Sequence, residues 1–173
     1  MKKFFLVVSA ALSISFLSNN LFAQTAPAAP VVDVLATISS SFDYNDLGLA
    51  IRVVNLQSTV TAAGPYTIFA PLNTAFTTLT PGKLDSLFSD PVKLAALVKG
   101  HIAAGKFDKA ALIKAIQSKT PITTLDGKLL TVTVNDKKHV QLTTADGAKA
   151  QVISFDIPAS NGVVIGIDAV LAK

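Results

Sequence analysis

The chain has 173 residues, half of them hydrophobic, and a formal net charge of +4. It contains no cysteine and no glutamate, so disulfide bonds cannot stabilise it and its stability must come from a buried core. Its basic residues are spread singly apart from Lys2-Lys3 and Lys137-Lys138. Because a nucleic-acid interface needs a clustered basic stripe, we expect no nucleic-acid partner.

The first 23 residues have the layout of a secretory signal peptide. Lys2 and Lys3 precede an uncharged apolar run over residues 4–17, and Ala23 supplies a small residue for cleavage. The run is shorter than the roughly 20 apolar residues that a membrane-spanning helix needs. We therefore predict cleavage after Ala23 and no integral membrane segment in the mature chain, which is expected in the periplasm or outside the cell.

Residues 24–30 read QTAPAAP and are predicted to form an extended linker, because proline and alanine favour a solvated, extended chain. No internal repeat is visible, so we place one domain at residues 31–173. Loss of the two lysines of the signal peptide lowers the net charge from +4 to +2.

Hydrophobic periodicity predicts helices in the first half of the domain. Apolar residues recur at helical spacing over residues 31–39 and 42–56, and Leu47, Ala50 and Ile51 form one stripe of the second segment. These helices should cover a core. Further elements are expected as a strand over residues 65–71 and as helices starting near Asn73, after Pro81, over residues 90–103 and over residues 108–117.

The spacing of the apolar residues changes to a period of two after Pro121. Asp126-Gly127, Asn135-Asp136 and Asp146-Gly147 separate the alternating runs, and Asp-Gly between such runs is a strong hairpin signal. Residues 163–171 are apolar on both faces apart from one aspartate, as expected for a strand buried on both sides. Helices followed by an antiparallel meander predict an α+β domain.

Three segments carry a family resemblance, in the family's order and at plausible spacing. Residues 67–76 (TIFAPLNTAF) resemble the first signature of fasciclin-like domains, and residues 161–171 (NGVVIGIDAVL) resemble the second. Residues 97–107 (LVKGHIAAGKF) resemble the family's central tyrosine-histidine segment. The motif residues with an expected structural role are Thr67, Phe69, Ala70, Pro71, Asn73, Phe76, His101, Asn161, Gly162 and Asp168.

The resemblance implies an α+β fold with helices in the N-terminal half and a wedge-shaped, antiparallel, β-sandwich-like sheet in the C-terminal half. It also implies a secreted or surface protein that mediates adhesion, although a fold alone never fixes a function. Two positions depart from the family pattern. Gly100 stands where a tyrosine is expected, and Ile165 stands where a histidine is often found.

Several motif residues have direct structural interpretations. Asn73 follows a strand and precedes a helix, so its side-chain oxygen is predicted to cap that helix. Pro71 should end the strand, and Phe69 and Phe76 are expected in the core. His101 follows Leu97 by four residues on an apolar helix face, which predicts a hydrogen-bonded interior histidine.

Metal and catalytic sites are not indicated. His139 is the only other histidine, and although aspartates could complete a two-histidine site, no spacing specifies one, so we predict no metal. The chain has no G-x-S-x-G elbow and no glycine-rich phosphate loop, and its 11 acidic residues are aspartates scattered singly. We therefore expect neither an enzyme nor a cofactor.

Asp156 and Ile157 form the one candidate binding pair. In some animal relatives an Asp-Ile pair at this offset from the second signature belongs to a cell-adhesion motif. The segment before Asn161 is predicted to be a surface loop that Pro158 holds away from sheet pairing. In the alternative interpretation, Asp156 caps or turns the chain while Ile157 packs inward.

Two functions remain open at this point. The first is a monomeric, secreted, non-catalytic module for adhesion or for contact with extracellular matrix or biofilm, whose partner is an extracellular protein or polysaccharide. The second is a soluble periplasmic carrier or sensor of a small ligand or lipid, with a pocket between helices and sheet.

Overall fold

The computed structural model describes residues 32–172, so the predicted signal peptide and linker lie outside the described residues. Within this range, none of the helices has the length and apolar character that crossing a membrane requires. The helices are α1 (Val34–Ser39), α2 (Asn45–Val53), α3 (Gln57–Thr61), α4 (Asn73–Thr77), α5 (Pro81–Ser89), α6 (Pro91–Gly100) and α7 (Lys109–Ser118). The strands are β1 (Tyr66–Pro71), β2 (Ile102–Ala104), β3 (Ile122–Thr123), β4 (Leu129–Val134), β5 (Val140–Thr144), β6 (Lys149–Ala159) and β7 (Gly162–Ile167).

Aspartates begin three of the helices. Asp33 precedes α1 and accepts the Ala36 N–H at 2.7 Å, and Asp108 accepts the Ala111 N–H at the start of α7 at 2.9 Å. Asp90 does the same for α6, where a proline occupies the first turn. Each carboxylate satisfies a backbone N–H that has no partner inside its helix, and its charge suits the positive end of the helix dipole.

The seven strands form one sheet in the order β2-β1-β7-β6-β5-β4-β3. The predicted meander of β3 to β6 is antiparallel, but β1 and β7 run parallel, from Tyr66 opposite Gly162 to Pro71 opposite Ile167. The expectation of an antiparallel sandwich is therefore wrong, because the sheet is mixed. A bridge between Ala103 and Thr124 joins its two edges, so the sheet curls until it is nearly closed.

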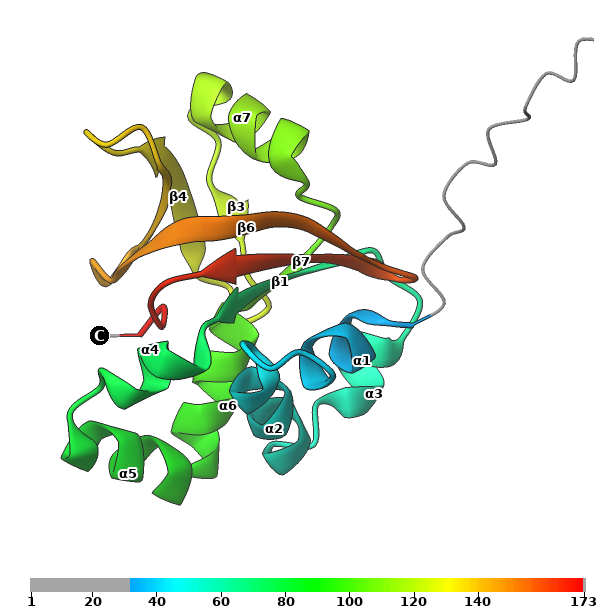
Figure 1. Cartoon of the computed structure of the whole chain (residues 1–173), viewed down its shortest axis with the longest axis vertical. Coiled ribbons are helices and arrows are strands. Elements are labelled where there is room, and N and C mark those ends of the chain that lie inside the picture. The colour runs from blue at the N-terminus through cyan, green and yellow to red at the C-terminus, as the bar shows by residue number, and fades with distance from the viewer. Residues whose placement is uncertain (1–31, 173) are drawn as a thin grey trace, which may run out of the picture.

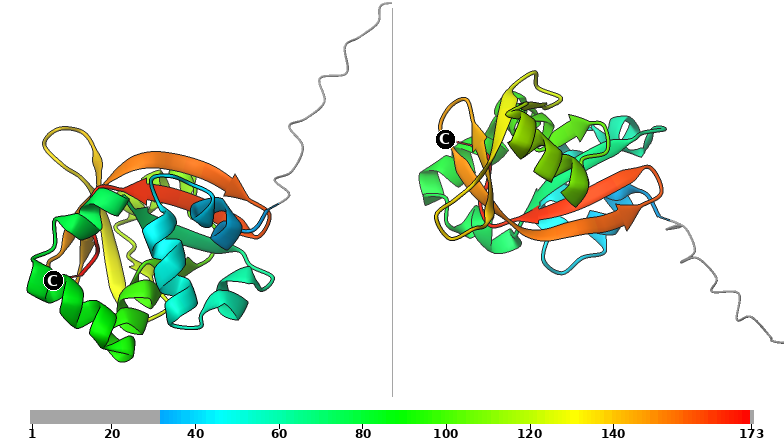
Figure 2. Two further views of the ribbon diagram at one scale, coloured as in Figure 1. Left: turned by 60° about the horizontal axis from the view of Figure 1, so that its bottom comes forward. Right: turned by 90° about the horizontal axis from the view of Figure 1, so that it is seen from above.

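The helices divide between the two faces of the sheet (Figure 1). Helices α1 to α6 lie on one side of β1 and β7, and α7 lies on the other side, against β4. Figure 2 shows the long β6–β7 hairpin running along the domain to a tip beside α1. At that tip the Ser160 N–H donates to the Val32 carbonyl at 2.8 Å, which ties the hairpin to the segment that precedes α1.

Two hydrophobic clusters meet across β1 and β7. Ile68 and Val164 belong to the cluster under the helices, whereas Phe69 and Ile165 belong to the cluster inside the curled sheet. Successive strand residues point to opposite faces, so each of these strands supplies both cores. The predicted two-sided burial of β7 is confirmed, although the strand ends at Ile167 rather than at residue 171.

The predicted helix over residues 90–103 is too long. Helix α6 ends at Gly100, and Ile102 to Ala104 form β2, which pairs antiparallel with β1. The Phe69 N–H donates to the His101 carbonyl at 2.8 Å. Gly100 is a weak helix former, and β1 provides a pairing partner for residues 102–104. Together these two effects override the local helical pattern.

Candidate functional site

His101 lies where α6 ends and β2 begins, and its side chain is fully buried. Its Nδ1 lies 2.7 Å from the Leu97 carbonyl oxygen, and its Nε2 accepts the Leu171 N–H at 2.9 Å. Burial lowers the pKa of His101 to about 4, although the Leu97 carbonyl and the nearby Asp126 charge oppose the shift. The ring is therefore neutral at pH 7, with the proton on Nδ1.

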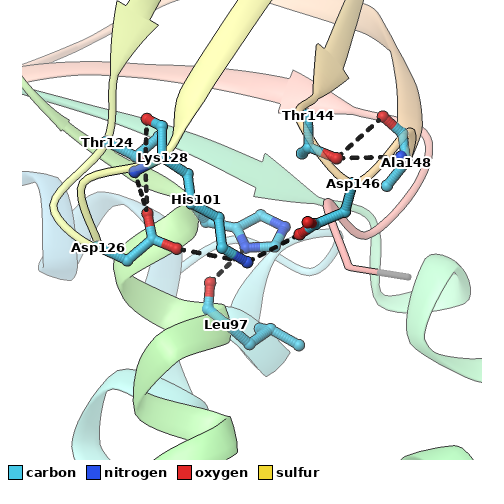
Figure 3. A network of polar contacts seen from close by, with 8 residues as sticks. All are labelled: Leu97, His101, Thr124, Asp126, Lys128, Thr144, Asp146 and Ala148. Carbon is cyan, nitrogen blue, oxygen red and sulfur yellow. Dashed lines mark hydrogen bonds and ion pairs between the residues drawn. The ribbon is translucent and has the colours of Figure 1, made fainter.

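A cleft of about 240 Å³ opens beside His101, between α5 and α6 on one side and two hairpin turns on the other. Its apolar wall includes Leu97, Leu130 and Leu171, and its polar wall includes Asp126, Lys128 and Asp146. The β3–β4 turn and the β5–β6 turn supply the polar wall, because alternate turns of an antiparallel meander lie at the same end of the sheet. Figure 3 shows this wall in front of the histidine.

Lys128 bridges the two turns. Its Nζ lies 2.9 Å from Asp146 Oδ2 and 3.8 Å from Asp126 Oδ2. The hydrogen bond to Asp146 raises the pKa of Lys128 above its ordinary value, although burial opposes the shift. Asp126 Oδ1 accepts hydrogen bonds from the Thr124 hydroxyl and, at 3.3 Å, from the Lys128 N–H. The three charged side chains thus form one network across the cleft (Figure 3).

The three side chains differ in exposure. The side chain of Asp126 is 9% exposed, whereas those of Lys128 and Asp146 are 49% and 54% exposed. Asp126 is therefore held inside the cleft, and the Lys128–Asp146 pair stands at its mouth. Both aspartates are predicted from sequence only as turn residues, but two Asp-Gly turns separated by two strands already indicate that they share one end of the sheet.

Gly100 borders the same cleft, at the position where the family pattern has a tyrosine. A Cβ atom at Gly100 would lie 3.4 Å from Asp126 Oδ2, with the Asp126 side chain its nearest neighbour. The glycine therefore leaves space in front of that carboxylate. The other departure, Ile165, is fully buried in β7 and packs in the cluster around Phe69.

The first signature holds β1 in place. The Thr67 hydroxyl is buried, donates to the Gly105 carbonyl at 2.7 Å and accepts the Phe107 N–H at 2.8 Å. Phe69 and Ala70 are fully buried and belong to different clusters, and Phe76 is buried under the helices. Pro71 is the last residue of β1.

The predicted cap of α4 by Asn73 is wrong. Asn73 is itself the first residue of that helix, and its Oδ1 accepts the Asp46 N–H of α2 at 3.1 Å. Its Nδ2 donates to the Phe42 carbonyl and to Asn45 Oδ1, both at 2.8 Å. Asn73 thus caps a neighbouring helix across the fold, a role that local sequence cannot reveal because residues 27 positions apart must first meet.

The second signature ties the β6–β7 hairpin to α1 and α3. Asn161 Oδ1 accepts the Val34 N–H at 2.9 Å, and its Nδ2 donates to the Val60 carbonyl at 2.8 Å. A Cβ atom at Gly162 would lie only 1.9 Å from the Tyr66 carbonyl oxygen, so the position requires glycine. After β7, the Asp168 carboxylate accepts the Gln151 N–H of β6 at 2.6 Å.

Asp156 and Ile157 lie within β6 and not in a loop, so that prediction is wrong. Ile157 pairs with Val164, and the register shifts between residues 154 and 157, where Asp156 has φ 56°. Asp156 is exposed and accepts the Lys109 N–H at the start of α7 at 2.8 Å. Pro158 fits the strand because the β5–β6 pairing ends at Gln151, far from this proline.

The pair is remote from the cleft. Strand β6 begins at Lys149, three residues after Asp146 of the cleft, and Asp156 follows seven residues later. An extended strand rises about 3.3 Å per residue, so about 23 Å separate the two positions along the strand. The fold does not bring the sequence-predicted binding pair and the His101 cleft together.

Comparison with known proteins identifies the class of this domain. The fasciclin domain model matches residues 43–173. The insect cell adhesion molecule fasciclin I contains a FAS1 domain pair whose structure superposes with a TM-score of 0.71 at 17% identity, over 83% of this chain and 52% of that one. The chain therefore belongs to the fasciclin domain family, whose domains are generally non-catalytic binding modules.

Curated relatives share the domain in different settings. Protein sll1483 of Synechocystis is 35% identical over 151 residues, covering 86% of this chain and 76% of its own. Immunogenic protein MPB70 of Mycobacterium bovis is 31% identical, covering 68% of this chain and 54% of its own. The rabbit transforming growth factor-beta-induced protein ig-h3 is 31% identical over 85% of this chain, which spans only 20% of that protein.

Proposed function

We propose that the protein is a secreted, monomeric, non-catalytic adhesion module that binds an extracellular protein or polysaccharide in a matrix or biofilm. The observation that carries the proposal is the fasciclin match over residues 43–173, together with the likeness to an insect cell adhesion molecule. The signal-like segment at residues 1–23 supports export.

The polar groups around His101 support binding rather than catalysis. A general base needs a ring nitrogen within reach of the proton that it removes. Both ring nitrogens of His101 already bond to backbone groups, Leu97 and Leu171, and the side chain is fully buried. The two carboxylates of the cleft share Lys128 as their cation, and the exposed part of this network can offer hydrogen bonds to a ligand.

One observation also favours a small-ligand carrier as a second candidate. The cleft has an apolar wall of leucines beside its charged wall, and such mixed cavities are typical of small-molecule sites. A lipid tail would nevertheless displace water from Lys128 and Asp146, whose side chains are about half exposed, without offering new hydrogen bonds, which is costly. Adhesion through a polar ligand therefore suits the cleft better than lipid transport does.

The binding role of Asp156 and Ile157 stays a prediction. The register shift of β6 between residues 154 and 157 is a β-bulge that keeps Asp156 on the surface. Bulges often re-aim side chains near functional sites. Ile157 packs against the helical cluster, so a contact here would be carried mainly by Asp156.

Retention on a panel of immobilised matrix proteins and polysaccharides tests the proposal. The mature protein should bind at least one surface, and Asp156→Ala should weaken that binding if the bulge is the contact. Melting curves must accompany the assay, because loss of the bond to the Lys109 N–H should cost about 1 kcal/mol. Unchanged retention of folded Asp156→Ala would remove the bulge from the binding surface, and retention on no surface would contradict adhesion.

A further inference from the structure

We propose that the cleft beside Gly100 binds an uncharged, polyhydroxylated ring, such as one sugar residue of a neutral polysaccharide. The inference rests on the proposed adhesion function and names the partner of one site. It follows from the charge balance of the cleft, from the hydrogen-bond donors and acceptors of its polar wall, and from the leucines of its apolar wall.

The charges of the cleft cancel. Among the cleft-lining residues in the described part of the chain, the charged ones are Lys93, Lys128, Asp126 and Asp146. An ionic ligand would meet as many like charges as opposite ones, so it would gain no net attraction to offset the loss of its own hydration. A ligand without net charge avoids that cost.

The polar wall of the cleft can both donate and accept hydrogen bonds. Asp126 Oδ2 lies 3.8 Å from Lys128 Nζ, which is beyond the length of a hydrogen bond, so this oxygen can still accept from a ligand hydroxyl. Lys128 Nζ carries three protons, of which Asp146 Oδ2 takes one at 2.9 Å. Hydroxyl groups both donate and accept, so adjacent hydroxyls on one ring can bond to the carboxylate and to the ammonium.

The leucine wall suits the other face of such a ring. Leu97, Leu130 and Leu171 also line the cleft, and the small exposed part of these largely buried side chains can contact C–H groups. A wholly apolar ligand would displace water from the polar wall without replacing the hydrogen bonds of that water. The volume of about 240 Å³ lies below the range of drug-sized pockets, so the cleft accommodates a single ring of a longer chain.

Gly100 is the position at which ligand access can be controlled. Its backbone is outside the left-handed region, and a Cβ atom there makes only an ordinary contact with Asp126. Gly100→Ala should therefore fold and leave the cleft open. Gly100→Phe should place a ring in front of Asp126 and fill the space that the ligand needs.

The experiment titrates the mature protein with neutral, anionic and cationic oligosaccharides, namely tetramers of glucose and mannose, oligogalacturonate and chitosan oligomers. A neutral tetramer should bind, with an affinity that changes less than about twofold between 50 and 500 mM salt, because no net charge is neutralised. Gly100→Phe and Asp126→Asn should each weaken binding at least about tenfold. Gly100→Ala and Asp136→Asn, a matched aspartate in the β4–β5 turn, should leave it unchanged.

Three results would overturn the inference: no neutral tetramer binds, a charged oligomer binds best with strong salt dependence, or neutral binding survives in both Gly100→Phe and Asp126→Asn. Melting curves establish which variants are folded. If Gly100→Phe does not fold, the binding measured for Asp126→Asn decides the test. Retention on the panel of matrix surfaces is measured on the same variants. Full retention without any sugar binding would reject this cleft as the contact while leaving the adhesion proposal intact.

Discussion

Asn73 illustrates how one side chain can organise two helices. Its amide makes three hydrogen bonds to the segment from Phe42 to Asp46, although it stands in α4. The start of α2 has no capping side chain of its own, so Asn73 supplies the acceptor for that helix. The motif residue therefore stabilises the contact between α2 and α4 rather than its own helix.

Asn73→Ala should lower the free energy of unfolding by about 2 kcal/mol, because it removes the cap and leaves partners unpaired. Asn73→Asp keeps an oxygen for the Asp46 N–H but loses the amide donors, so its loss should be intermediate. Denaturant midpoints measure both effects, with Ser58→Ala at an exposed site as the control. An alanine variant as stable as the parent would contradict the role assigned to Asn73.

His101 makes stability depend on pH in a defined direction. Its pKa falls from 6.5 in the unfolded chain to about 4 in the folded one, chiefly through burial. The unfolded chain therefore takes up the proton first as the pH falls, and stability is lost between pH 6.5 and about 4. Below about pH 4 the histidine is protonated in both states, so its contribution to the stability changes no further.

The pKa difference of His101 corresponds to about 3 kcal/mol between neutral pH and pH 4. His101→Gln should lose this part of the pH dependence, because glutamine does not titrate, even though its overall stability is lower. Urea unfolding at several pH values between 7 and 4 makes the comparison. Parallel stability profiles for parent and variant would show that His101 is not the group responsible.

At the level of elements, the parallel pairing of β1 and β7 is the central feature of the fold. The two strands approach so closely at one end that only glycine fits at position 162, opposite Tyr66. Gly162→Ala should force the strands apart and lower stability by about 3 kcal/mol, as overpacking does. Gly82→Ala in α5 is the matched control, because a Cβ atom there meets no neighbour within 4 Å.

The control should keep its stability or gain up to about 1 kcal/mol, since alanine is the better helix former. Thermal melting of both alanine variants gives the result directly. Equal melting temperatures for Gly162→Ala and the parent would mean that the β1–β7 contact can relax without cost.

Local patterns predicted most elements but not their long-range partners. The Asp-Gly turns and the alternating runs indicated the hairpins of β3 to β6, and the doubly apolar run indicated the buried β7. No local signal reveals that β1 pairs parallel to a strand about 96 residues away, because that pairing depends on the whole chain. The same holds for β2, where tertiary pairing replaced the end of a predicted helix.

The candidate site was predictable only in part. His101 and its apolar neighbours stood out in the sequence, but the Asp126–Lys128–Asp146 network depends on two turns meeting at one end of the sheet. Asp156 was expected in a loop because Pro158 suggested an interruption. Proline is tolerated at an unpaired strand edge, and the bulge absorbs the positive φ of Asp156.

At the scale of the whole molecule, the domain joins two cores through one central pair of strands and leaves a charged cleft at one end. Three side chains hold its parts together. Asn73 joins α4 to α2, Asn161 joins the hairpin tip to α1, and His101 bonds to the C-terminal segment at Leu171. Such a scaffold can present a fixed surface to a partner, and a pre-organised surface loses little freedom on binding.

Attachment of the producing organism to matrix-coated surfaces tests the adhesion proposal most directly. A strain lacking this chain should attach less, and adding the purified mature protein or restoring the gene should recover attachment. A folded Gly100→Phe protein should restore attachment less well if the cleft carries the contact. Equal attachment by the parent and deletion strains on every surface, with no effect of added protein, would contradict the account.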